Sequence, residues 1–176
     1  MILRRRFLIG AIVLAVLLFV VLNMTFNSTD STAVFQDKEN VSIAVTGDVM
    51  FARNMPNVLS LDSSPFEGVS DVTSNVDLLL INFENAATTS GDALKGDVPL
   101  KCDPSYVPLA KANNNTVASI ANNHALDYGI TGMKDTIQNL KNAGITPIGA
   151  GENEDEAHQC VTKDINGRKV TIVNYM

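Results

Sequence analysis

Cysteine, histidine and tryptophan are scarce in this chain of 176 residues, which has two cysteines, two histidines and no tryptophan. Cys102 and Cys160 are far apart in the sequence and do not form a Cys-x-x-Cys pair. A structural zinc site built on thiolates is therefore not expected. A disulfide between them is left open, because a sequence does not show whether two Cα atoms come within bridging distance.

Basic residues are outnumbered, with 13 Lys and Arg against 19 Asp and Glu and a formal net charge of −6. Binding to a nucleic-acid backbone needs clustered Lys and Arg, so no nucleic-acid partner is expected. The acidic balance fits a cation site, and it fits an ordinary solvated surface equally well.

Charge is absent from residues 7–24, which follow three consecutive arginines at 4–6. As a helix this run is about 27 Å long, close to the roughly 30 Å of a bilayer core. It is longer than a typical signal-peptide core and no Ala-x-Ala site follows it, so we expect an uncleaved signal anchor in residues 1–24. The arginines predict a cytoplasmic N-terminus and an extracytoplasmic domain on the cell membrane. Residues 25–39 are polar and predict a tether.

Three short apolar runs occur in residues 40–176, the expected globular domain. They lie at 41–46, 77–82 and 116–121 and are typical of strands buried on both faces of a parallel sheet. Helices are predicted between them and beyond, at 105–113, 131–143 and 154–159, with Gly144 ending the second of these.

A fourth strand is predicted at 146–149, and a hairpin follows. Asn166-Gly167 supplies the residues of a type I′ turn, with the last strand expected at 169–175. The predicted fold class is α/β, with a mostly parallel sheet and flanking helices. Because the last strand runs to Met176, we expect a domain truncated at its C-terminus.

Polar residues follow each of the first three predicted strands. They are Asp48, Glu84 and the pair Asn123-His124. The carboxyl ends of parallel strands meet at one edge of a sheet, where ligands bind. Oxygen donors with one imidazole suit Mn²⁺, Mg²⁺, Fe or Zn²⁺, and two such ions can clamp a phosphoryl group. Taken singly, Asp48 is more typical of a turn, Glu84 is compatible with a surface charge and Asn123-His124 with a loop, so the prediction depends on their combination.

The segments around these residues carry a family resemblance. They read TGDVMFAR at 46–53, INFENAAT at 81–88, IANNHALDYG at 120–129 and GAGENEDEA at 149–157. Over residues 41–176 they resemble the poly-γ-glutamate capsule biosynthesis (CapA-type) family, which is similar to calcineurin-like metallophosphoesterases. The resemblance implies a partial metallophosphoesterase-like fold.

The resemblance also implies roles for individual residues. Asp48 would be the first metal ligand and Glu84 the bridging carboxylate, with Asn123 as an amide ligand and Asn122 as the second choice. His124 would polarise or protonate the leaving group.

By the same resemblance Asp127 would orient His124, since a carboxylate fixes the tautomer of an imidazole. Two features depart from the phosphoesterase pattern. Met50 stands where a histidine is usual, and later histidine motifs are missing. The second histidine, His158, is expected at the surface.

These patterns predict a membrane-anchored capsule or exopolymer biosynthesis protein with a metal-dependent phosphoesterase-like site. Its partners would be an anionic polymer or phosphoester substrate, the cytoplasmic membrane and a capsule-synthesis membrane complex. One alternative is a non-catalytic scaffold or polymer-binding partner with a decayed site. Another is a general metallophosphoesterase unrelated to capsule.

Overall fold

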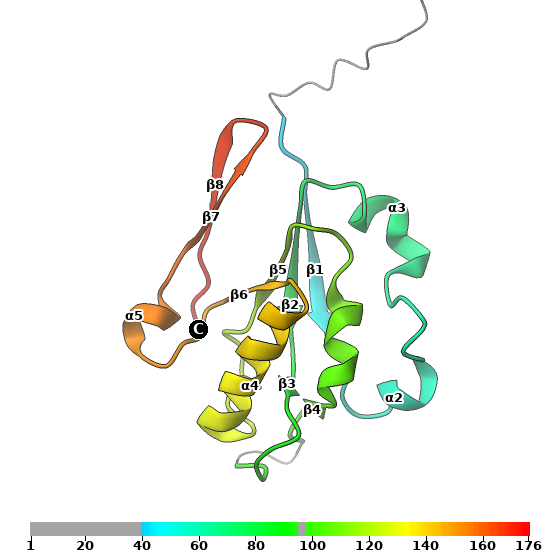
Figure 1. The fold of residues 1–176 in the computed structure, drawn as a ribbon, viewed down its shortest axis with the longest axis vertical. Helices are drawn as coiled ribbons and strands as arrows, with labels where there is room; N and C mark the ends of the chain where they lie inside the picture. Colours follow the sequence, from blue (N-terminus) through cyan, green and yellow to red (C-terminus); the bar gives the residue numbers. More distant parts are fainter. Residues whose placement is uncertain (1–39, 95–97) are drawn as a thin grey trace, which may run out of the picture. The chain divides into compact units, whose positions relative to one another are not determined.

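A computed structural model describes residues 40–94 and 98–176 of the chain (Figure 1). The predicted anchor at 1–24 and tether at 25–39 lie outside these residues. Within the described ranges, no helix has the length and apolar character needed to cross a membrane.

Four parallel strands form the central sheet, in the order β1-β2-β5-β6. They are β1 (Ile43–Val49), β2 (Leu78–Phe83), β5 (Thr116–Ser119) and β6 (Thr146–Ile148). The predicted α/β class with a mostly parallel sheet is confirmed, and each strand lies within a few residues of its predicted position.

Strand β1 differs from the prediction that the strands are buried on both faces. Among the described strands it has one neighbour and lies at the edge, and Ile43 and Val45 are 47% and 69% exposed. The sequence is as apolar as that of an inner strand, so the pattern alone did not distinguish an edge from the middle of the sheet.

Helices cover one face of the sheet. The principal one is α4 (Gly129–Asn142), which begins two residues before the predicted helix and is followed by Gly144 at a φ of 72°. The helix predicted at 105–113 is instead the 3-10 helix η2 (Pro104–Ala110), capped by the Asp103 carboxylate, which accepts from the Ser105 N–H at 2.8 Å. Pro108 lacks an N–H donor, which disfavours a regular α-helix there.

Shorter elements complete the chain. Between β1 and β2 lie α2 (Met55–Val58), η1 (Glu67–Val69) and α3 (Ser70–Thr73). Two parallel two-residue strands, β3 (Ala86–Ala87) and β4 (Lys101–Cys102), follow β2. The predicted short helix near 154–159 is α5 (Glu154–Ala157).

The predicted hairpin is also present, as β7 (Val161–Ile165) and β8 (Arg168–Ile172). Asn166 and Gly167 both have positive φ angles, 54° and 78°, as a type I′ turn requires. The last strand ends at Ile172, three residues before the predicted end.

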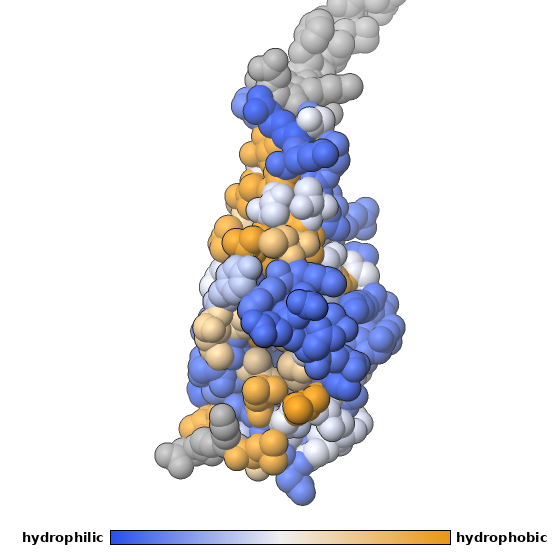
Figure 2. All heavy atoms as spheres, turned by 90° about the vertical axis from the view of Figure 1, so that its left-hand side faces the viewer, coloured by the Kyte–Doolittle hydropathy of each residue, from blue (hydrophilic) through white to orange (hydrophobic). Residues whose placement is uncertain are grey.

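Alternate residues of the strands face two separate cores. Leu79, Ile81 and Phe83 pack with Leu140 of α4 on the helix side. Leu78 packs with Ile165 and other apolar residues of the hairpin on the opposite side. Each fully buried side chain of this size contributes about 1.5–3 kcal/mol of hydrophobic stabilisation. Figure 2, which faces the hairpin side of Figure 1, shows a broad hydrophilic area in the middle of this face, with hydrophobic residues above and below it.

Both cysteines are free, so the disulfide left open by the sequence is not formed. Cys102 is buried and Cys160 is exposed. Burial raises the pKa of the Cys102 thiol to about 12, which keeps it protonated at neutral pH.

Candidate functional site

The candidate site lies at the carboxyl ends of β1, β2 and β5. A β-bulge in β1 determines which side chains meet there, because the four residues of β1 from Val45 to Asp48 lie opposite only three residues of β2, from Leu80 to Asn82. The extra residue places Asp48 directly opposite Asn82. Glu84 follows β2 two residues after Asn82, so its side chain emerges on the same side.

The side-chain amide of Asn82 joins the two carboxylates. Its Nδ2 donates to Asp48 Oδ1 at 2.9 Å and also to Glu84 Oε2. Two hydrogen bonds from one nitrogen keep these oxygens within about 6 Å of each other. Asp48 is exposed, whereas Glu84 is 8% exposed, so the pair sits at the boundary between solvent and core.

Asn122 links this amide to the segment that follows β5. Its Nδ2 donates to Asn82 Oδ1 and to the Phe83 carbonyl, both at 3.0 Å. Its own Oδ1 accepts from the His124 N–H at 3.1 Å, which forms an Asx-turn. The side chain is 9% exposed and its amide is fully engaged within the protein.

His124 is held between two carboxylates. Its Nδ1 lies 2.7 Å from Asp127 Oδ2, and its Nε2 lies 4.0 Å from Glu84 Oε1. An ionised carboxylate only accepts, so Asp127 fixes Nδ1 as the donor and leaves Nε2 facing Glu84. The same Asp127 oxygen accepts from the Leu100 N–H at 2.7 Å, which anchors this buried carboxylate.

The structure therefore brings together Asp48, Glu84, His124 and Asp127 of the predicted site. Asn123 has an exposed side chain that makes no hydrogen bond with the described residues, while the second choice, Asn122, is inside the network. Sequence reasoning missed Asn82. The signal was available, because residues two apart on a strand share a face and Asn82 precedes Glu84 by two.

The donor set fits a hard divalent cation in type. Asp48 Oδ2 and Glu84 Oε1 are not used by Asn82, and the exposed Asn123 offers an amide oxygen. The number of charged or imidazole ligands is small, since the described residues contain no group of three or more His, Cys, Asp or Glu side chains arranged to hold a metal. Further ligands would have to be amides, water or substrate.

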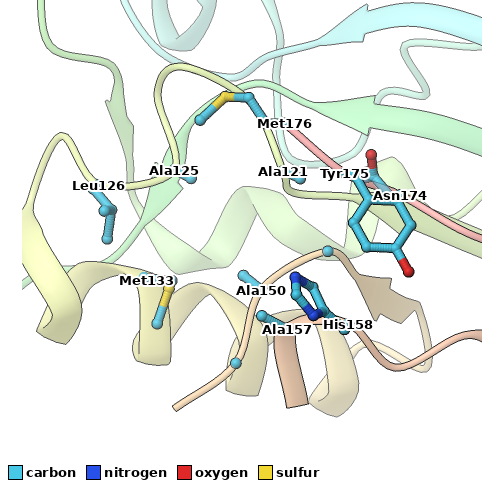
Figure 3. A pocket seen from close by; sticks show the side chains of 12 residues that line it. Ala121, Ala125, Leu126, Met133, Ala150, Ala157, His158, Asn174, Tyr175 and Met176 are labelled. Atoms are coloured by element: carbon cyan, nitrogen blue, oxygen red, sulfur yellow. The ribbon is translucent and has the colours of Figure 1, made fainter. Parts of the chain in front are cut away.

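A cavity of about 260 Å³ borders the same loop (Figure 3). Ala121 and Ala125, on either side of the Asn122–His124 segment, line it, and so do residues that follow β6. His158 is exposed, as predicted, and its ring lies 5.2 Å from that of Tyr175 at the cavity wall. None of the site's carboxylates lines this cavity, so it is a neighbour of the candidate site.

Comparison with known proteins gives a consistent set of relatives. Residues 42–176 match the family described as "Bacterial capsule synthesis protein PGA_cap". The capsule biosynthesis protein CapA of Bacillus anthracis is 30% identical over 174 residues, which is 94% of this chain and 42% of that protein.

Two further relatives carry related descriptions. The PGA biosynthesis protein CapA of Bacillus subtilis is 29% identical over 140 residues, covering 77% of this chain and 37% of the relative. A probable polyglutamine synthesis accessory protein of Mycobacterium tuberculosis is 41% identical over 76 residues, covering 43% and 20%. The chain spans about two fifths of the length of the two Bacillus proteins.

Proposed function

Since the chain belongs to the bacterial capsule synthesis protein family, we propose that it takes part in making a capsule or exopolymer of the poly-γ-glutamate type. Family membership confirms the resemblance drawn from the sequence motifs. The names of the two Bacillus relatives support the polymer assignment. A membrane anchor at 1–24, an extracytoplasmic domain and a capsule-synthesis membrane complex remain part of the proposal, and they rest on the sequence pattern alone.

The second part of the proposal is a metal-dependent phosphoesterase-like site. Asp48 and Glu84 would hold a divalent cation, Mn²⁺, Mg²⁺, Fe or Zn²⁺, with Asn123 as a further ligand. Such an ion polarises a phosphoryl or carbonyl oxygen and activates water. The supporting observation is that both carboxylates bond one amide while His124 Nε2 lies 4.0 Å from Glu84.

The residues around the cation site would divide the remaining work. His124 would exchange a proton with the substrate at Nε2, the ring nitrogen that faces Glu84. Asp127 would hold the ring in the tautomer that leaves Nε2 available. An anionic polymer or a phosphoester would be the substrate, with its negative charge directed to the cation.

A titration of the full chain with Mn²⁺, followed by calorimetry, tests this site. Asp48→Ala should weaken saturable binding by at least about 100-fold, since loss of a direct ligand should exceed the 10–100-fold typical of supporting residues. Asp62→Ala, which removes an exposed carboxylate elsewhere, is the matched control and should bind Mn²⁺ like the parent. Absence of saturable binding in the parent protein would defeat the metal-site proposal.

A second candidate is a non-catalytic scaffold or polymer-binding partner. It is favoured by Met50 in the place of the usual histidine and by the absence, in residues 40–94 and 98–176, of a three-ligand His, Cys, Asp or Glu group. It predicts that the chain binds poly-γ-glutamate with the same affinity with or without Mn²⁺, and that Asp48→Ala leaves this affinity unchanged.

A further inference from the structure

We infer that Asn82 is a positioning residue of the proposed metal site and determines which oxygen of each carboxylate faces the cation. This inference rests on the proposed function. Asn82 was not among the residues predicted from the sequence. It acts on the site through Asp48 and Glu84, the two carboxylates to which its amide donates.

Both N–H groups and the carbonyl oxygen of the Asn82 side chain have partners. Its two N–H groups go to Asp48 and Glu84, and its Oδ1 accepts from Asn122 at 3.0 Å. Turning the amide over would direct its oxygen at two carboxylates and its N–H groups at the donor of Asn122. Only one orientation of this amide is therefore compatible with its neighbours.

This orientation selects the free oxygen of each carboxylate. Asp48 accepts from the amide through Oδ1, so its Oδ2 is not used by Asn82. Glu84 accepts through Oε2, so its Oε1 is not used by Asn82. Glu84 Oε1 is also the oxygen nearest His124 Nε2. A cation held by the two free oxygens would thus lie on the side of the cluster where His124 can meet a substrate.

The fold itself maintains this arrangement. The bulge in β1 brings Asp48 opposite Asn82, and Asn122 ties the Asn82 amide to the loop after β5. Supporting hydrogen bonds of this kind orient metal ligands, and their loss typically weakens metal affinity 10–100-fold.

Two substitutions of the full chain test the role. Asn82→Leu has similar volume and no hydrogen bond, and should weaken Mn²⁺ binding 10–100-fold by calorimetry. Asn82→Asp replaces the shared donor with a third carboxylate. It should lower the melting temperature without metal and increase the melting-temperature rise that saturating Mn²⁺ produces, relative to the parent.

Asn115→Leu is the matched control. Asn115 is also a half-buried asparagine next to the sheet, donating to the Asp77 carbonyl at 3.0 Å at the opposite ends of the strands. Its substitution should lower the melting temperature and leave Mn²⁺ affinity unchanged.

The results for these variants distinguish failure of the role of Asn82 from failure of the proposed metal site. Parent-like Mn²⁺ affinity in Asn82→Leu, with binding lost in Asp48→Ala, would overturn the role of Asn82 and keep the metal site. Should Asn82→Leu not fold, a parent-like Mn²⁺ effect on the melting of Asn82→Asp would overturn it instead. If Asp48→Ala binds like the parent, the proposed site and the role of Asn82 both fail.

Discussion

The parallel strands of the sheet carry a network of polar side chains at each end, and the two networks are built differently. At the amino ends, the bonds run mainly from side chains to the backbone. At the carboxyl ends, the bonds run mainly between side chains. The members of the first network are Ser42, Asp77, Asn113, Asn115 and Asn166. Those of the second are Asp48, Asn82, Glu84, Asn122, His124 and Asp127.

The amino-end network completes the hydrogen bonding of the chain where strands begin. Asp77 accepts from the backbone N–H of Ser42 at 2.8 Å and from its hydroxyl at 2.7 Å. Asn113 donates to the carbonyls of Thr73 and Val76, at 3.0 and 3.3 Å. Buried or half-buried backbone groups need such partners, so this network serves stability.

The carboxyl-end network instead gathers two carboxylates around one amide, with an imidazole beside them. Bringing like charges together is costly unless a donor or a cation lies between them. The contrast supports the proposal of a binding site at the carboxyl end of the sheet, whereas the amino end serves folding. Substitutions at the amino end should therefore change stability alone, and those at the carboxyl end should change the site.

Asn113→Ala should give the largest effect on folding among these tests. The substitution removes the Nδ2 group that donates to the carbonyls of Thr73 and Val76. It also removes the Oδ1 atom that accepts from the Asn115 N–H at 2.9 Å. A loss of about 2 kcal/mol in the free energy of unfolding is expected, measured by urea denaturation. Asn114→Ala, at an exposed neighbouring position, should be close to neutral. Altered Mn²⁺ binding in Asn113→Ala would break the division between the two ends.

Asp127 combines the two roles, because it bonds both a backbone group and a side chain of the candidate site. One of its oxygens accepts from the Leu100 backbone and from His124 Nδ1. In Asp127→Asn, the amide oxygen can still accept from Leu100, so the fold should be retained. The weaker, uncharged acceptor should lower the preference for the Nδ1–H tautomer of His124 about fivefold, the equivalent of about 1 kcal/mol.

Nitrogen-15 chemical shifts of the histidine rings measure this tautomer ratio directly. His158, the other histidine, is exposed on the C-terminal side of α5 and gives an internal control whose ratio should not move. An unchanged ratio at His124 would show that Asp127 acts only on the backbone at Leu100.

Much of the fold was predictable from local patterns. The Asn166-Gly167 turn requires positive φ at both residues and was found where predicted. The α4 helix was placed by its apolar spacing and its terminal glycine. The exposure of β1 was not predictable, because the position of a strand within a sheet depends on its neighbours in space.

The candidate site was predictable in part for the same reason. Asp48, Glu84 and His124 each follow an apolar run, so their meeting follows from the parallel sheet. The register shift in β1 is not encoded in any spacing pattern, and it is what makes Asn82 the partner of Asp48. The choice between Asn122 and Asn123 depended on an Asx-turn that turns one amide inward and leaves the other exposed.

The smallest predicted effect is the loss of stability that Asp77, at the amino ends of the strands, causes at low pH. The hydrogen bonds from the backbone and side chain of Ser42, and a weaker one from Asn166, hold the pKa of Asp77 below its usual value. The folded protein therefore binds fewer protons here than the unfolded chain as the pH falls toward 4, and stability declines with falling pH. The contribution of Asp77 is complete above its unfolded pKa and lost once the pH passes below the folded one.

Comparing the parent with Asp77→Asn isolates this contribution. Asp103 and Glu156 also have lowered pKa values, because hydrogen bonds from Ser105 and Glu152 favour their ionised forms, but both remain in each protein and their contributions cancel. The difference in melting temperature should be constant near neutral pH and should shrink as the pH drops below about 4. A difference that persists at pH 2 would mean that Asp77 supports the amino end by its shape alone. Of the two networks, only the one at the carboxyl ends would then depend on the charge of its carboxylates.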